Sequence, residues 1–117
     1  MHANGFYENQ NAAMLDMKQR APDIARGFGS MFATLMKDGA LPARDKELIA
    51  LGISLALRCE PCIWSHVEKC LKLGATPAQI LDAASVAVVM QGGPTYTYIP
   101  KVLAALDHLT PAPAART

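Results

Sequence analysis

The segment Arg58-Cys-Glu-Pro-Cys-Ile-Trp-Ser-His-Val-Glu-Lys-Cys70 predicts a helix that begins on a pair of reactive cysteines. Proline fits the first turn of a helix, where its missing N–H needs no partner, so Pro61 marks the helix start. Cys59 then takes the cap position and Cys62 lies in the first turn. Because a helix start carries about half a positive charge and several unpaired N–H groups, it favours a thiolate over a thiol. The segment therefore indicates a redox site.

His66 lies four residues after Cys62, and side chains four residues apart on a helix share a face. An imidazole in that place can take the Cys62 proton or hold the thiolate as an ion pair. Cys70 lies about 12 Å of helix beyond Cys62, too far for zinc–sulfur bonds of about 2.3 Å to join the two. We interpret Cys70 as a buried structural thiol. A metal site using only Cys59, Cys62 and His66 stays geometrically open, but the redox interpretation needs neither metal nor cofactor.

The composition of the chain narrows the possible partners and locations. It has 117 residues, a formal net charge of +1 and three cysteines. Charges of both signs are mixed and no run of Lys or Arg occurs, which argues against nucleic acid and anionic membrane surfaces. The longest apolar runs, 49–57 and 83–90, fall short of the roughly 20 residues that span a bilayer. The first ten residues lack a signal-peptide pattern, so we expect a cytoplasmic protein with a catalytic or metal-binding cysteine pair.

Helical spacing of apolar residues, interrupted by proline and glycine, predicts an all-α fold of about five to six helices. The expected helices cover residues 9–20, 22–36, 42–57, 60–73, 78–91 and 94–109, and Pro100 should kink the last of them. Thr76-Pro77 supplies a cap and a first-turn proline, and Gly74 suits a left-handed cap. Residues 49–57 are apolar on almost every side, which predicts a buried helix.

The same pattern predicts one domain over residues 9–109, preceded by a flexible start at 1–8 and followed by a disordered tail at 110–117. The helix expected at 78–91 carries more apolar surface than one small core needs. We expect part of that surface to contact another subunit, and therefore an oligomer.

Glu47, eleven intervening residues, Cys59, two residues, Cys62, three residues and His66 form a pattern that resembles a known motif. It is the motif of the AhpD-like alkylhydroperoxidases within the carboxymuconolactone decarboxylase family. The similarity extends over residues 41–109 and includes the Leu-Gly-Ala-Thr turn at 73–76.

The resemblance implies an all-helical, AhpD-like bundle whose small subunits assemble as homotrimers or homohexamers. It also implies a thiol peroxidase or disulfide reductase in which Cys62 attacks a hydroperoxide. Cys59 would then form a disulfide with Cys62, and an external dithiol or redox protein would reduce it. His66 and Glu47 would form the proton relay that activates Cys62.

Two departures from the patterns of the family bear on the function. Some alkylhydroperoxidases of this type carry a histidine directly before the second cysteine, where this chain has Pro61. The lactone decarboxylases of the family, by contrast, generally lack the cysteine pair, so its presence here favours redox chemistry. The alternatives are a decarboxylase-type enzyme that holds a small cyclic carboxylic acid with Arg44 or Arg58, and a non-enzymatic metal-binding or redox-sensing module.

Overall fold

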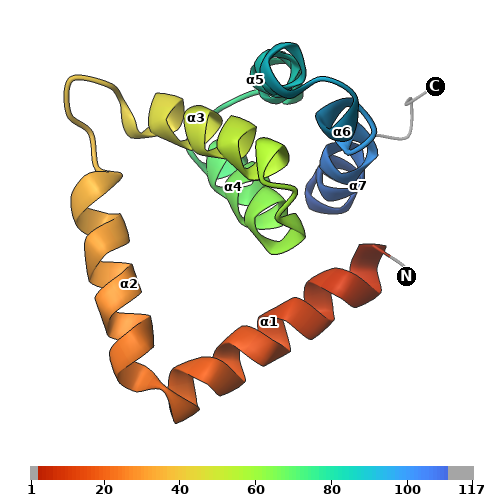
Figure 1. Ribbon diagram of the computed structural model, residues 1–117. Coiled ribbons are helices and arrows are strands. Elements are labelled where there is room, and N and C mark those ends of the chain that lie inside the picture. Colours follow the sequence, from red (N-terminus) through yellow and green to blue (C-terminus); the bar gives the residue numbers. More distant parts are fainter. Residues whose placement is uncertain (1–2, 111–117) are drawn as a thin grey trace. The chain divides into compact units, whose positions relative to one another are not determined.

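The computed structural model describes residues 3–110, and the secondary structure in that range is entirely helical (Figure 1). The chain order is α1 (Ala3–Arg20), α2 (Pro22–Leu35), α3 (Ala43–Ala56), α4 (Glu60–Lys72), α5 (Pro77–Gln91), α6 (Gly93–Tyr96) and α7 (Ile99–Leu109). The predicted all-α class is confirmed, with α6 amounting to a single turn. Among these described helices, none combines the length and apolar character needed to cross a membrane. Most of the predicted tail, residues 111–117, lies outside the described range.

The chain divides into two compact units, Met1–Ala43 and Arg44–Thr117. In the first unit, α1 and α2 meet at Ala21 and diverge from that residue (Figure 1). Helix α1 begins at Ala3, six residues before the predicted start at Asn9. The prediction relied on apolar content, which is thin here. Helix formation also depends on backbone propensity, and no proline or glycine interrupts residues 6–20.

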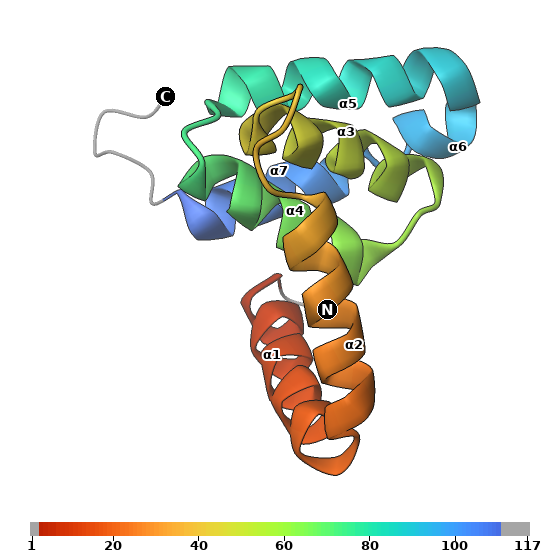
Figure 2. The same cartoon turned by 90° about the vertical axis from the view of Figure 1, so that its left-hand side faces the viewer.

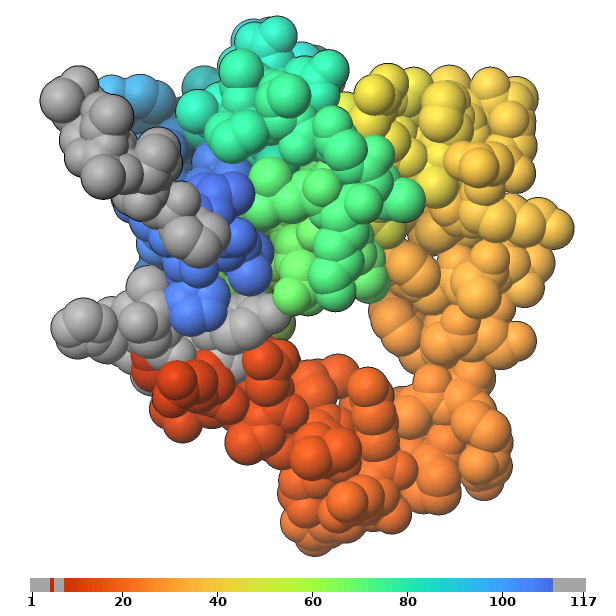
Figure 3. All heavy atoms as spheres, turned by 180° about the vertical axis from the view of Figure 1, so that it is seen from behind, coloured from red at the N-terminus to blue at the C-terminus, as the bar shows by residue number. Residues whose placement is uncertain are grey.

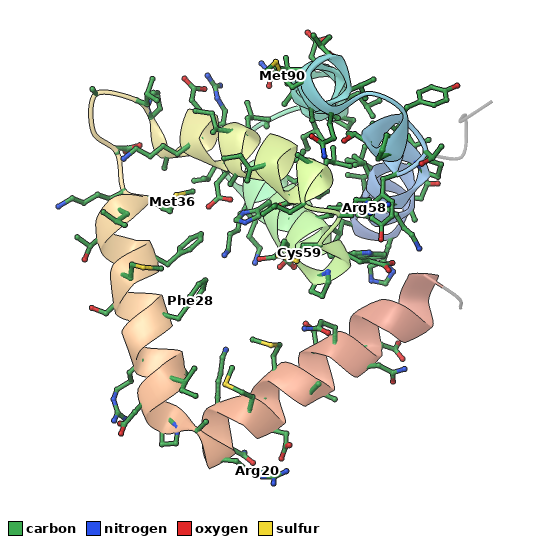
Figure 4. All side chains as sticks on the ribbon, viewed as in Figure 1. Arg20, Phe28, Met36, Arg58, Cys59 and Met90 are labelled. Atoms are coloured by element: carbon green, nitrogen blue, oxygen red, sulfur yellow. A yellow bond between two sulfur atoms is a disulfide. The ribbon has the colours of Figure 1, made fainter. Side chains whose placement is uncertain are left out.

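Helix α2 places its large apolar side chains on the surface of its unit. None of its described side chains is buried, and Phe28 is 60% exposed. Figure 4 shows Phe28 projecting from the helix. The exposed apolar residues of this helix are Ile24, Phe28, Met31 and Leu35. Their spacing of four, three and four residues makes a continuous stripe like the seam of a coiled coil.

The second unit contains α3 to α7 and the hydrophobic core around the cysteine pair. Helices α4 and α7 pack against each other, and α5 packs against both (Figure 2). The green atoms of α4 and the blue atoms of α7 are in contact in Figure 3. The fully buried large side chains of this core are Leu51, Leu55, Ile63, Val67, Ile80 and Val102. Helix α4 contributes Ile63 and Val67 to this core, and the other residues come from α3, α5 and α7.

The prediction that residues 49–57 are buried all round is wrong for this chain. Leu51, Ser54 and Leu55 face the core, whereas Ile49, Ile53 and Leu57 are more than half exposed. The exposed residues recur every four positions, so they lie on the outer side of α3 and of the turn that follows it. Ser54, the polar residue in the run, is buried because its hydroxyl donates a 2.7 Å hydrogen bond to the Ala50 carbonyl.

The predicted helix over 94–109 is in fact two helices. Tyr98 lies between α6 and α7 and Pro100 falls in the first turn of α7. Proline is tolerated in a first turn because the N–H it lacks would have no helical partner there. Pro100 therefore begins a helix and does not kink one.

Candidate active site

The cysteine pair lies at the start of α4, as the sequence predicted. Cys59 is the cap residue, and its Sγ accepts a hydrogen bond from the Cys62 N–H at 3.3 Å. The two sulfur atoms form a disulfide with an S–S distance of 2.07 Å. Both residues are partly exposed, so reagents from solvent can reach this end of the helix.

Glu47 on α3 and His66 on α4 are in direct contact. The distance between Glu47 Oε1 and His66 Nδ1 is 2.6 Å. The Glu47 side chain is only 4% exposed and that of His66 is 15% exposed. A buried carboxylate is costly unless a hydrogen bond or an opposite charge compensates it, and His66 supplies that partner. The two residues are 19 positions apart in the sequence. His66 lies one helical turn beyond Cys62 on α4, so the contact forms close to the cysteine pair.

Cys70 is structurally different from the other two cysteines. It is a free thiol with 0% exposure, one turn beyond His66 on α4. Burial, together with the nearby charge of Glu47, raises the pKa of the Cys70 thiol to about 12. A thiol that stays protonated is a poor nucleophile and a poor metal ligand. These properties fit the predicted structural role.

The turn that leads into the pair depends on a residue that the sequence analysis did not single out for it. Arg58 has a φ of 52°, the left-handed conformation, which a helix-ending corner usually assigns to glycine. The Arg58 N–H bonds to the Leu55 carbonyl and the Cys59 N–H bonds to the Ser54 carbonyl, both at 3.0 Å. These two bonds define a Schellman motif, in which Arg58 is the left-handed residue. Cys59 therefore closes α3 and caps α4 at once.

A signal for this corner was present in the sequence. The helix expected at 42–57 and the cap at Cys59 leave one residue between them, and a connection that short requires a left-handed turn.

Among the described residues, no group of three or more His, Cys, Asp and Glu side chains could hold a metal ion.

Comparison with known proteins places this geometry in a family. A sequence model of the carboxymuconolactone decarboxylase family matches residues 22–107. "Uncharacterized protein 4 in cox locus" from Paracoccus denitrificans is 34% identical over 99 residues, which cover 85% of this chain and 89% of that protein. An uncharacterized protein from Cupriavidus necator is also 34% identical, with 80% of this chain and 96% of that protein covered.

Solved structures agree with the sequence comparison. The apo form of a carboxymuconolactone decarboxylase family protein from Legionella pneumophila is 30% identical, with a TM-score of 0.85 over 92% of this chain and 96% of that chain. A family member from Thermotoga maritima, for which an involvement in antioxidative response has been suggested, is 28% identical. Its TM-score is 0.67 over 73% of this chain and 88% of that chain. This chain therefore belongs to the carboxymuconolactone decarboxylase family.

Proposed function

We propose that this protein is a thiol-dependent peroxidase or disulfide reductase, an antioxidant oxidoreductase of the alkylhydroperoxidase type. The observation that carries the proposal is the 2.6 Å contact of buried Glu47 with His66, one helical turn after Cys62. A solvated histidine on a helix needs no such partner. A histidine that exchanges protons with a thiol does, because the carboxylate fixes the orientation of its ring.

The oxidative half of the cycle uses both cysteines. The Cys62 thiolate attacks the outer peroxide oxygen, the O–O bond breaks, and the alkoxide leaves as an alcohol after taking a proton. Cys62 is then a sulfenic acid. The Cys59 thiolate attacks that sulfur, water leaves, and a Cys59–Cys62 disulfide forms. One hydroperoxide and one dithiol thus become an alcohol, water and one disulfide.

His66 and Glu47 supply the proton transfers of this cycle. If His66 Nδ1–H donates to Glu47, the neutral ring has its second nitrogen, Nε2, available for the proton of Cys62. The same proton can then be returned to the alkoxide. The relay therefore does not need a histidine at the position of Pro61.

The reductive half needs an external dithiol or redox protein. Its thiolate attacks one sulfur of the Cys59–Cys62 bond to form a mixed disulfide, which its second thiol resolves. The donor becomes a disulfide and the protein recovers both thiols. We propose a cytoplasmic location for this cycle, since reducing compartments keep such donors in their dithiol form.

The test is intact-mass spectrometry of the reduced protein, under native and denaturing conditions, before and after one equivalent of cumene hydroperoxide. We expect the rapid loss of two hydrogens, peptide mapping of a Cys59–Cys62 disulfide, and a native mass without metal. Cys62→Ser should consume no peroxide, whereas Cys70→Ala should react like the wild type because Cys70 is buried and protonated.

Other outcomes would contradict the proposal. Peroxide consumption by Cys62→Ser would remove the nucleophile assignment. Thiols that stay reduced, together with zinc bound in the native protein, would favour the metal-binding module. Thiols that stay reduced in a protein without bound metal would favour the decarboxylase-type enzyme.

We also propose that a second copy of this chain covers the apolar stripe of α2, in a homotrimer or homohexamer. The four stripe residues have the spacing by which helices pair with one another. Exposed apolar side chains recur on α5, where Met90 is 80% exposed (Figure 4). A surface with this many exposed large apolar residues is typical of a subunit contact.

Light scattering coupled to size-exclusion chromatography tests the assembly. We expect a trimeric or hexameric mass for the wild type and a smaller species for Phe28→Glu, which places a charge in the middle of the stripe. Glu8→Gln changes charge in the same unit and should leave the mass unchanged. A monomeric wild type would refute the proposal.

A further inference from the structure

We propose that Arg58 is a specificity-determining residue that favours anionic, carboxylate-bearing substrates at the Cys59–Cys62 pair. The inference rests on the proposed redox function and deepens it, because it names the charge class of the molecule that meets the thiols.

The backbone conformation of Arg58 is the first observation. A Schellman corner lies at each end of α4, and the left-handed residues of these corners are Arg58 and Gly74. Glycine adopts this conformation without steric conflict, whereas a residue with a Cβ is disfavoured there. Such outliers concentrate at functional sites, where the side chain has a use that offsets the strain. At the corner next to the redox pair, the residue that replaces glycine carries a positive charge.

The charges around the pair are the second observation. Arg58 is exposed and forms no ion pair with any residue that the structure describes. The acidic residue adjacent to the pair, Glu60, is 3.3 Å from Lys101 on α7. The carboxylate of Glu47 is in contact with His66. Both of these acids are thus engaged by other groups, and the charged residue before Cys59 has no acidic partner among the described residues.

The third observation is the position of Arg58 in the chain, directly before the cap of α4. Arg58 is covalently adjacent to Cys59, the sulfur of which caps α4 at its positive end. A molecule that approaches either sulfur therefore enters a region of positive potential. The guanidinium offers a planar set of donors that matches a carboxylate better than an ammonium does. The site should accordingly react faster with hydroperoxides or disulfides that carry a carboxylate than with neutral ones of equal intrinsic reactivity.

The test compares two aromatic disulfides that react with thiols whether or not the protein consumes peroxide. Dithiobis(nitrobenzoate) carries two carboxylates and dithiodipyridine carries none. In either case a protein thiolate attacks the reagent and releases one aryl thiol. The second cysteine then displaces another aryl thiol and forms the Cys59–Cys62 disulfide. The rates are measured by stopped-flow absorbance on the reduced protein, and the anionic-to-neutral rate ratio is the readout.

Three variants define the expected result. Arg58→Gln removes the charge and keeps a side chain at the left-handed position, so the ratio should fall about threefold or more. Arg58→Lys keeps the charge and should retain most of the ratio. Lys72→Gln removes an exposed charge about 15 Å of helix from Cys62 and should leave the ratio unchanged. Raising the salt to about 0.5 M should shrink the wild-type ratio and not that of Arg58→Gln.

An Arg58→Gln variant that slows both reagents equally, or neither, would overturn the proposal, because a structural role does not distinguish reagent charge. The outcome is separate from that of the peroxide experiment. Thiols that react with both reagents and with no hydroperoxide would refute the peroxidase function, and the rate ratio would still decide the role of Arg58.

Discussion

The two ends of α4 are built on the same backbone plan but with different residues. Leu57-Arg58-Cys59 precedes the helix and Leu73-Gly74-Ala75 follows it. In each triplet the middle residue is left-handed, with φ of 52° for Arg58 and 93° for Gly74. At the second corner the Gly74 N–H bonds to Leu71 at 3.1 Å and the Ala75 N–H to Cys70 at 2.9 Å, which repeats the pattern of the first.

The difference lies in what each corner has to do. The corner at Gly74 only reverses the chain, so glycine removes the steric conflict. The corner at Arg58 also delivers a cysteine to the cap of the next helix, and it tolerates a conformation that costs a residue with a Cβ about 1–2 kcal/mol. The two corners share a hydrogen-bond pattern but differ in the left-handed residue. We attribute that difference to the functional role of the corner at Arg58.

The largest expected effect is on peroxide turnover at the cysteine end of α4. Glu47→Gln keeps the size of the side chain but leaves His66 without a carboxylate, so peroxide turnover should fall by about 10²–10⁴-fold. Peroxide consumption under single-turnover conditions measures the loss. Asp82→Asn removes an exposed carboxylate on α5 and serves as the matched control. A Glu47→Gln variant with wild-type turnover and wild-type thermal stability would show that the relay is not used.

The next effect belongs to the other end of α4 and depends on pH. The Cys70 pKa is raised from 9.0 to about 12, so folding holds the proton more tightly than the unfolded chain does. This contribution to stability is complete below pH 9 and is lost as the pH rises towards 12, by about 1.4 kcal/mol per pH unit at most. Urea unfolding of the oxidised protein at pH 8 and at a pH near 10.5 measures the loss. Cys70→Ala should show a smaller pH dependence, and an equal one would contradict the assignment.

Sequence reasoning predicted the features of α4 that are encoded within one helical turn. The cap at Cys59, the first-turn Pro61 and the left-handed Gly74 are as expected. Thr76 forms the predicted cap, and Gln79 completes a capping box with it. Such features depend on the residues next to them, and their physical basis is local.

Features that depend on tertiary structure were harder to predict. The contact of Glu47 with His66 crosses two helices, and only the resemblance to a family motif pointed to it. The composition of α3 concealed its exposed row, because a helix that is apolar on all sides does not reveal which side meets the core. The conformation of Arg58 was missed for another reason: arginine itself gives no sign of a left-handed turn, and only the one-residue connection between the two expected helices indicated it.

A smaller effect is expected at the structural corner. Gly74→Ala places a Cβ on a left-handed residue, and that Cβ would meet no described atom within 4 Å. The cost is therefore conformational and should be about 1 kcal/mol. Thermal or urea unfolding measures it, and turnover should not change because the substitution lies at the far end of α4 from the thiols. A neutral result would mean that the corner relaxes out of the left-handed region.

The smallest expected effect is an increase in the free energy of unfolding. Arg58→Gly relieves the left-handed strain, but glycine also gives the unfolded chain more freedom, so the net gain should be about 0.5 kcal/mol. Arg58→Gln keeps a Cβ and should unfold like the wild type, which makes it the control in the same urea titration. Arg58→Gly should also lose the preference for anionic disulfides. A variant that is more stable and less selective would show that strain at this corner is retained for the charge it carries. A loss of stability in Arg58→Gly would instead assign Arg58 a packing role and make the two ends of α4 alike.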